Sequence, residues 1–592
     1  MDDSRPQDLN SILAADFGSV STRVLLFGLA RGRFRLVACA EAPTTALPPF
    51  GDVGEGLRHA LGELTRVTGR RMLSESDQLI IPERGASAGA DEFVATASGG
   101  RPMRVVLVGL VPEISLESAR RALSSTYMTI EDTISLADPR SENEQINAII
   151  AHTPDVVFIV GGTDDGAEDA VLNLVKRVSV ALSLMEKGFR PRVLFAGNAA
   201  LQQPVREIFG DQTDVHIAGN VRPSLIDETL DPAQTRLGSV YDGYKASSAG
   251  GFRDISQWSR VGVLPTSQGF SRLVGFLAAA ASDGAGPRPA LGVDVGSATT
   301  VLAAAWEGKN LVSVRSDLGL GHSAVTALEA VGAENVARWL TYEVDPVEIE
   351  DYAWNKWLRP DTVPHTTANL EMEMALAREI IRVALEGTRN TWRRLPREGV
   401  YLPRFDPIVL AGAVFGKAPH PGHAALLALD ALQPVGVTRL LLDPYGLAQA
   451  LGAAAYLSPL AVVQVLQGGD LPTLGTVLAP VGRLKAGEVA LRLRIRVGET
   501  VRDEAVRAGT VRTIPLGADV DRALVVVKPH RRLDLGRGNG KQVNLEVQNG
   551  LLGLVCDARG RPLPLPRTVE ERARVYPAWV AQIAGQEDVV LP

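Results

Sequence analysis

The chain has 592 residues, of which 45% are hydrophobic and 22% are charged, and its formal net charge is −7. At about 150 residues per domain this length predicts roughly four domains, the ordinary composition excludes a wholly disordered chain, and the negative charge argues against a nucleic-acid partner. Two cysteines are too few for a disulfide framework or a thiolate zinc site, so we expect a cytoplasmic protein.

The amino-terminal region is predicted to form a β-meander. Its first ten residues are net acidic and lack the positive charge of a signal peptide. The apolar run Ile12–Asp16 ends in an acid, and the strand-like runs Val24–Phe27 and Phe34–Ala40 follow it across short turns. Further along, we expect Gln78–Ile81 and Phe93–Ala97 to pair as a hairpin.

From about residue 104, strand-like runs alternate with helical patterns. Such alternation favours crossover connections onto a parallel sheet. Three of the strands lead into the small-residue turns Gly161–Asp164, Ala196–Asn198 and Ala218–Asn220. Ligands of open α/β sheets bind at such carboxyl ends, and plain strand-to-helix turns without a ligand are the alternative. The predicted strands are Val105–Leu110, Val156–Val160, Val193–Ala196 and Val215–Ala218.

The opening pattern returns in the second half of the chain. The run Asp283–Pro289 is rich in Gly and Pro and is interpreted as a hinge or boundary. Leu291–Asp294 is again an apolar strand that ends in Asp, and a long amphipathic helix is predicted at about Asn369–Arg394. The apolar stretch Leu447–Leu466 is interrupted by Pro459 and two glutamines, so we expect a buried helix rather than a membrane span. Short strand candidates beyond about residue 468 predict a β-rich appended domain.

One motif occurs twice, and it is the most informative feature of the sequence. In each copy an apolar strand ends in Asp, and a Gly-Ser turn leads to Thr and a second strand. Glycine lets backbone N–H groups approach an anion, Ser and Thr hydroxyls donate to phosphate oxygens, and a neighbouring carboxylate can hold Mg²⁺ or its waters. Two facing copies would therefore clamp a polyphosphate. The copies are Asp16-Phe17-Gly18-Ser19-Val20-Ser21-Thr22 and Asp294-Val295-Gly296-Ser297-Ala298-Thr299-Thr300.

This pair resembles the two phosphate-binding hairpins of the actin, sugar-kinase and heat-shock ATPase superfamily. In that superfamily two ribonuclease-H-like halves close on Mg·ATP. The third expected element is a strand followed by a glycine turn that packs against the adenosine, and Val409–Phe415, with Gly412 in its turn, is similar. The Ala- and Gly-rich run Gly446–Tyr456 resembles the second helix that connects the halves.

Within the superfamily, the sequence is similar to the MutL (GlmL) family, the accessory protein encoded with adenosylcobalamin-dependent glutamate mutase. By analogy with other cobalamin-enzyme reactivating factors, this family is thought to use ATP to help exchange a damaged cofactor. The likeness covers about residues 10–460. Its motifs, in chain order, are Asp16–Ser19, Gly109–Pro112, Pro154–Asp164, Val193–Asn198, Val263–Thr266, Val293–Gly296 and Asp317–Gly319.

The resemblance implies a mixed α/β fold. We expect two actin-like (ribonuclease-H-like) halves with an α/β unit between them and a β-rich C-terminal domain. The expected bounds are 1–100 for the first half, 101–224 for the α/β unit, 225–289 for the return to the first half and the hinge, 290–465 for the second half, and 466–592 for the β-rich domain.

The resemblance also implies ATP or ADP with Mg²⁺ as cofactors. Asp16 and Asp294 would be the catalytic carboxylates, and Asp16 would hold the metal through water. The implied nucleotide-binding residues are Gly18, Ser19, Thr22, Gly296, Ser297, Thr299, Thr300 and Gly412.

The second hairpin departs from the family pattern. That pattern has Gly-Gly and then an acid after the two threonines, where this chain has Ser297 and Val301. The adenosine turn also usually carries more glycine than Ala411-Gly412-Ala413. Because the missing acid would orient metal-bound water, we expect at most a slow ATPase.

Three functional classes are compatible with these residues. The first is a chaperone-like reactivating factor whose protein client is a cobalamin-dependent mutase, and the second is a non-catalytic scaffold with a degenerate nucleotide site. The third is a hydantoinase-like hydrolase, whose metal ligands are not apparent in the sequence. His420 and His423 have a helical spacing, but the prolines around them predict a loop. The client and any self-association stay open.

Overall fold

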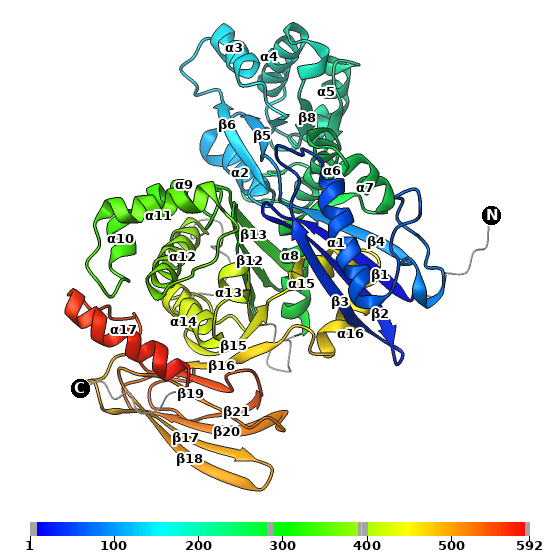
Figure 1. The fold of residues 1–592 in the computed structure, drawn as a ribbon. Helices are drawn as coiled ribbons and strands as arrows, with labels where there is room; N and C mark the ends of the chain where they lie inside the picture. Colours follow the sequence, from blue (N-terminus) through cyan, green and yellow to red (C-terminus); the bar gives the residue numbers. More distant parts are fainter. Residues whose placement is uncertain (1–8, 281–287, 389–391, 393–400, 586–592) are drawn as a thin grey trace. The chain divides into compact units, whose positions relative to one another are not determined.

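The computed structural model describes residues 9–280, 288–388, 392 and 401–585 (Figure 1). The chain divides into two compact units. Unit 1 comprises residues 1–27 and 37–269, and unit 2 comprises residues 28–36 and 270–592. Most of the predicted hinge at 283–289, and the end of the helix predicted to reach Arg394, lie outside the described residues.

The first sheet of unit 1 is built around the strand that carries the first motif. Its order is β10-β4-β1-β2-β3, and β4 pairs in parallel with both β1 and β10. Every residue of β1 is buried, which suits a strand in the middle of a sheet. The strands are β1 (Ser11–Phe17), β2 (Ser21–Ala30), β3 (Arg33–Pro43), β4 (Glu92–Ala97) and β10 (Val263–Pro265).

The predicted pairing of Gln78–Ile81 with Phe93–Ala97 is wrong. The second segment is β4, whose neighbours are β1 and β10, whereas Leu79 makes only an isolated bridge with Leu73. The strand predicted at Phe93–Ala97 does form, as β4. The local sequence could not identify its partner, because an apolar strand fits any neighbour that covers its edges.

A second sheet in unit 1 is wholly parallel, as the alternation predicted. Its order is β6-β5-β7-β8-β9, and the helices α2 (Glu117–Leu123), α3 (Glu142–His152), α4 (Asp169–Leu184) and α5 (Gln202–Phe209) lie between its strands in sequence. The strands are β5 (Met103–Val108), β6 (Met128–Ile134), β7 (Val156–Ile159), β8 (Arg192–Phe195) and β9 (Val215–Ile217).

The two sheets of unit 1 share one hydrophobic core. Leu13 and Phe17 of β1 lie in the same cluster as Val105 of β5 and Phe158 of β7. The helices α1 (Val53–Thr68), α6 (Asp231–Ser248) and α7 (Phe252–Trp258) contribute to it, and α8 (Thr266–Ala280) begins directly after β10. The helix α1 begins at Asp52, whose carboxylate accepts a hydrogen bond from the Gly54 N–H, and ends at Gly69 in the left-handed conformation.

Unit 2 contains an eight-stranded sheet that repeats the strand order of the first. Its order is β13-β12-β11-β14-β15-β16-β22-β19. A meander of β11, β12 and β13 has β14 and β15 parallel to its first strand, as β4 and β10 are parallel to β1. The strands are β11 (Ala290–Val295), β12 (Thr300–Trp306), β13 (Lys309–Arg315), β14 (Ile408–Ala411), β15 (Gly436–Asp443), β16 (Thr473–Ala479), β19 (Val511–Ile514) and β22 (Leu554–Asp557).

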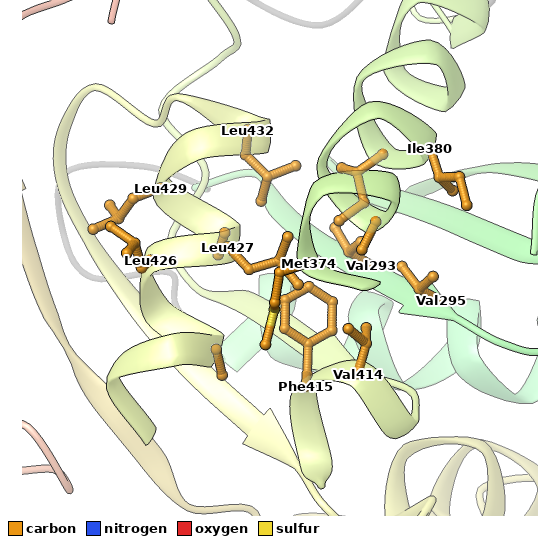
Figure 2. Packing of buried hydrophobic residues seen from close by; sticks show 14 of the residues in the cluster. Val293, Val295, Met374, Ile380, Val414, Phe415, Leu426, Leu427, Leu429 and Leu432 are labelled. Atoms are coloured by element: carbon orange, nitrogen blue, oxygen red, sulfur yellow. The ribbon is translucent and has the colours of Figure 1, made fainter. Parts of the chain in front are cut away.

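Helices pack against this sheet through a continuous apolar core. Figure 2 shows Met374 of α12, Leu427 of α14 and Phe415 of α13 pointing toward one another beside Val293 of β11. The helices that follow α8 in the chain are α9 (Ala324–Val331), α10 (Ala333–Ala337), α11 (Pro346–Leu358), α12 (Thr367–Thr388), α13 (Ala413–Gly416), α14 (Pro421–Leu432), α15 (Leu447–Ala454), α16 (Pro459–Gln467) and α17 (Val569–Ile583).

The carboxyl-terminal region adds an antiparallel sheet of order β18-β17-β20-β21, formed by β17 (Val489–Val497), β18 (Thr500–Arg507), β20 (Arg522–Pro529) and β21 (Val543–Gln548). The expected mixed α/β fold, with two equivalent sheets, a parallel α/β sheet and a β-rich end, is confirmed. The apolar stretch Leu447–Leu466 forms two helices, α15 and α16. Within the described ranges, no helix combines the length and the apolar character that crossing a membrane requires.

Candidate functional site: two equivalent hairpins

The two copies of the motif fold into the same turn. The Gly18 N–H donates to the Ser21 carbonyl at 2.9 Å, and the Gly296 N–H donates to the Thr299 carbonyl at 2.8 Å. A Cβ at Gly18 or Gly296 would lie only 2.9 or 3.1 Å from that same carbonyl oxygen, so the turn needs glycine in both sheets.

Backbone N–H groups are left open at the tip of each turn. Those of Ser19 and Val20 in unit 1, and of Ser297 and Ala298 in unit 2, donate no backbone hydrogen bond within the part of the chain that the structure describes. Adjacent unpaired N–H groups in a tight turn form a concave, electropositive surface that suits an anion. Each hairpin therefore has the chemistry of a phosphate-binding half site.

Asp16 lies beside the first turn and is 4% exposed. Its Oδ1 accepts hydrogen bonds from Thr96 Oγ1 of β4 at 2.7 Å and from Thr266 Oγ1 of α8 at 2.9 Å. Its Oδ2 accepts none from the described residues. Burial raises the pKa of Asp16, while the two hydroxyls and the charge of Arg23 act in the opposite direction. One carboxylate oxygen thus remains available to a cation or its water.

Thr22 does not lie beside Asp16. It follows Ser21, which pairs with Gly18, and this register places it across from Phe17, on the face opposite to Asp16. Its side chain is fully buried, and a Cβ at Gly56 of α1 would lie 3.1 Å from its hydroxyl. The hydroxyl makes no hydrogen bond in the described chain. Thr22 is therefore a core residue behind the hairpin.

The second hairpin has the same arrangement of faces. Asp294 pairs with Val301 and Val295 pairs with Thr300, so Val301 shares the face of Asp294 and Thr300 lies on the opposite one. Thr300 is fully buried, and its hydroxyl too has no partner among the described residues. Asp294 accepts a hydrogen bond from Gln449 Nε2 of α15 at 2.9 Å. The departure noted in the sequence thus puts an apolar side chain next to the second carboxylate.

The structure adds a residue that the sequence did not predict, His322. Its Nδ1 lies 3.0 Å from Ser297 Oγ, and its backbone N–H donates to the same oxygen at 3.1 Å. Burial lowers the pKa of His322, so its neutral form is favoured. The signal was the Asp317–Gly319 motif just before it. That segment folds onto the turn, where the Leu320 N–H donates to the Gly296 carbonyl at 3.0 Å and the Gly321 N–H to the Ser297 carbonyl at 2.9 Å.

Gly412 also lies at the second hairpin. It has a φ of 97°, and a Cβ there would collide with the Val295 carbonyl, whose carbon would be 2.8 Å away. This glycine therefore allows the turn after β14 to contact the end of β11. Thr299, whose carbonyl closes the hairpin turn, is 9% exposed.

Other polar groups offer weaker sites. His420 caps α14 and His423 lies in its first turn, so the predicted loop is wrong at His423, because Pro421 occupies the first helical position where proline is well tolerated. No group of three or more potential metal ligands occurs in the described ranges. A hollow of about 740 Å³ in unit 1 is lined by several basic residues, but Arg190 and Arg192 there already donate to backbone carbonyls.

The solved structures that are similar to this chain include two that match most of its length. One is the ethanolamine utilization protein EutJ from Carboxydothermus hydrogenoformans, with a TM-score of 0.27 and 9% identity over 76% of this chain and 91% of that chain. The other is a diol dehydratase-reactivating factor in nucleotide-free form, with a TM-score of 0.29 and 12% identity over 78% and 99%. Both TM-scores are too low to support an argument. The fold is therefore described from the strand order of this chain's own sheets.

The comparisons of sequence are more specific. Protein MutL from Clostridium tetanomorphum is 23% identical over 395 aligned positions, and the match covers 64% of this chain and 78% of that protein. The family model described as MutL protein matches residues 12–468, which include both hairpins, the parallel α/β sheet and α15. Because this match spans well over half of the sequence, the chain belongs to the MutL protein family.

Proposed function

We propose that this chain is an accessory protein that binds an adenine nucleotide with Mg²⁺ through its two hairpins. One observation carries the proposal: in both sheets, a strand whose second-to-last residue is Asp is followed by a glycine turn with open N–H groups. A single turn of this kind is common in proteins. The same turn beside the same carboxylate in two equivalent sheets supports a common ligand with several phosphate groups.

The residues present fit the proposed ligand. The open N–H groups and the hydroxyls of Ser19, Ser297 and Thr299 would bind phosphate oxygens. The available oxygen of Asp16 suits Mg²⁺, which favours carboxylates and water. When bound, the metal would neutralise part of the phosphate charge. Gly412 would contact the adenosine, and Thr22 and Thr300 are assigned to the core instead.

A pair of substitutions in one hairpin tests this assignment. Ser19→Ala removes a proposed phosphate ligand, whereas the matched Thr22→Val changes a hydroxyl that faces α1. Calorimetric titration with ATP and Mg²⁺ should show about tenfold weaker binding for Ser19→Ala, because a hydrogen bond to a charged group is lost. Thr22→Val should bind as the wild type does. Equal affinities for all three proteins would contradict the assignment.

The proposed client is an adenosylcobalamin-dependent mutase, on the basis of the family resemblance. The test combines the purified chain with glutamate mutase that carries an inactivated cobalamin, together with ATP, Mg²⁺ and free adenosylcobalamin. Mutase activity should recover only when both the chain and the nucleotide are present. If activity does not recover although ATP binds, the client is a different protein or the chain acts as a scaffold.

Val301 favours the scaffold as the second candidate function. Its buried isopropyl group occupies the position across from Asp294 where an acid would help to orient water. Nucleotide binding without turnover would then hold an assembly in one state. A phosphate-release assay distinguishes the two functions.

A further inference from the structure

Lys245 of α6 is an unusual buried cation. It is 1% exposed, and its Nζ donates to the Gly99 carbonyl at 2.6 Å. Aromatic rings surround the ammonium group, and no carboxylate forms a salt bridge with it in the described chain. The distances from Nζ to the ring centroids are 6.0 Å for Tyr127, 5.1 Å for Tyr241, 5.5 Å for Tyr244 and 5.8 Å for Phe252.

This arrangement disfavours the charged form of the side chain. Burial, together with the positive charge of Arg101, lowers the pKa of Lys245 to about 7, and the charge of Asp155 offsets only part of the effect. The surrounding rings supply some cation–π stabilisation. An apolar side chain of the same length would nevertheless be the better choice for folding. A costly group at this position points to a role other than stability.

The Gly99 carbonyl, which accepts the hydrogen bond from Lys245, belongs to a turn that packs against the first hairpin. The N–H groups of Ser98 and Gly99 both donate to the Phe17 carbonyl, at 3.0 and 2.8 Å. A Cβ at Gly99 would lie 2.9 Å from the carbonyl carbon of Gly18, so the two backbones are in close contact. Lys245 thus bonds to a turn that itself bonds to the residues directly after Asp16.

Neighbouring side chains of α6 hold the two ends of the same turn. Tyr241 Oη donates to the Ala97 carbonyl at 2.9 Å, and Tyr244 Oη donates to the Arg101 carbonyl at 3.1 Å. Lys245 bonds to Gly99 in the middle of the turn, and Gly99 is the residue of the turn that contacts the hairpin at Gly18.

We propose that Lys245 is a positioning residue for the first half site. By holding the Gly99 carbonyl it fixes the Ser98–Gly100 turn against Phe17 and Gly18. This keeps the Ser19 and Val20 N–H groups in the orientation that receives phosphate. The predicted effect of Lys245 on ligand affinity rests on the proposed nucleotide binding. The predicted effect of Lys245 on the ordering of the hairpin does not depend on any ligand.

The test compares Lys245→Met with Tyr244→Phe. The first removes the bond to Gly99 and keeps a long apolar side chain, and the second removes the neighbouring bond to Arg101 while leaving Gly99 held. Lys245→Met should bind ATP with Mg²⁺ tenfold to a hundredfold more weakly, since displacement of binding groups by about 1 Å has effects of that size. Its melting temperature should not fall. Tyr244→Phe should bind within about twofold of the wild type.

Hydrogen exchange of the nucleotide-free proteins separates the two proposals. Peptides covering residues 14–22 should exchange faster in Lys245→Met than in the wild type or Tyr244→Phe, whether or not ATP binds. Gly99→Ala, whose new methyl group would collide with Gly18, should have the same effect by an independent route. Unchanged exchange in Lys245→Met, whatever Gly99→Ala does, or ATP affinity in Lys245→Met equal to that of a wild type that binds, would overturn the role of Lys245. Absence of binding by the wild type would instead overturn the proposed function alone.

Discussion

At the scale of single residues, the buried lysine makes a prediction about pH. Below pH about 7 the folded and unfolded chains both carry the Lys245 proton, so the folded state bears the full cost of the buried charge. As pH rises from there toward the ordinary pKa of 10.5, the folded chain releases the proton first and its relative stability increases. Lys245→Met should therefore be more stable than the wild type at pH 6, by at most on the order of 5 kcal/mol.

The measurement is the melting temperature of both proteins between pH 6 and pH 10. The advantage of Lys245→Met should shrink as pH rises. A constant difference across this range would mean that Lys245 keeps its proton in the folded protein up to pH 10, as it does in the unfolded chain.

The unpartnered threonines behind the hairpins make a second prediction. Thr22 and Thr300 each bury a hydroxyl without a partner in the described chain. Valine has the same shape and no polar atom to desolvate, so Thr22→Val and Thr300→Val should each stabilise the protein by about 1–2 kcal/mol. Thermal unfolding checks this, with Thr96→Val, which loses a bond to Asp16, as the destabilising control. Lower melting temperatures for both variants would show that these hydroxyls do have partners.

At the scale of elements, a buried ionic cluster fastens the carboxyl-terminal region to α14. Asp557 at the end of β22 accepts from Arg559 Nε at 2.9 Å and from Arg561 Nη2 at 2.6 Å. Arg559 Nη1 also donates to Asp430 of α14 at 2.7 Å, and Arg378 donates to the other oxygen of Asp430 at 2.8 Å. The cluster joins α14 and α12, within the family match, to a strand beyond residue 468.

Asp557→Asn should therefore destabilise unit 2 by about 3–5 kcal/mol, because it leaves buried arginine charge uncompensated. The matched control is Asp503→Asn, whose pair with Arg494 is exposed and should contribute little to stability because water screens it. Urea unfolding compares the two. Equal midpoints would contradict a structural role for the cluster.

The Asp557 carboxylate also determines how the stability of unit 2 changes at acid pH. Burial opposes ionisation, but the charges of Arg559 and Arg561 prevail and lower the pKa of Asp557 below its ordinary value of 3.8. The stabilisation is therefore complete above pH 3.8 and is lost as pH falls further. In Asp557→Asn this part of the acid dependence should be absent, and an unchanged acid transition would contradict the assignment.

The sequence predicted the features that depend on residues close together in the chain, and it missed those that depend on distant residues. The apolar strands with an Asp near their end and the glycine turns are local patterns, and the structure forms both, with each strand running one residue past its Asp. The face on which Thr22 and Thr300 lie depends on the register across the turn, which the motif alone does not fix. The contact of His322 with Ser297 spans 25 residues. The partner of Phe93–Ala97, and the extension of the eight-stranded sheet of unit 2 by β16, β22 and β19, are likewise long-range pairings that local periodicity does not encode.

At the scale of the whole molecule, turnover distinguishes a reactivating factor from a scaffold. If the acid of the family pattern, where this chain has Val301, orients water, the wild type should release phosphate slowly or not at all, because general-base assistance typically contributes about 10²–10⁴ in rate. Val301→Asp should gain activity if the rest of the site is intact. A wild-type rate of several phosphates released per second would contradict the claim that Val301 slows turnover. It would also contradict the proposed scaffold function.

The central claim is that the paired hairpins bind a nucleotide together with Mg²⁺. Calorimetric titration of the full chain with ATP, in Mg²⁺ and then in a chelator, tests it most directly, with Asp16→Asn measured alongside. We predict saturable binding of one ATP per chain in Mg²⁺, weakened both by the chelator and by the loss of the Asp16 carboxylate. No saturable heat at millimolar ATP, or binding that neither Mg²⁺ nor Asp16 affects, would contradict the account.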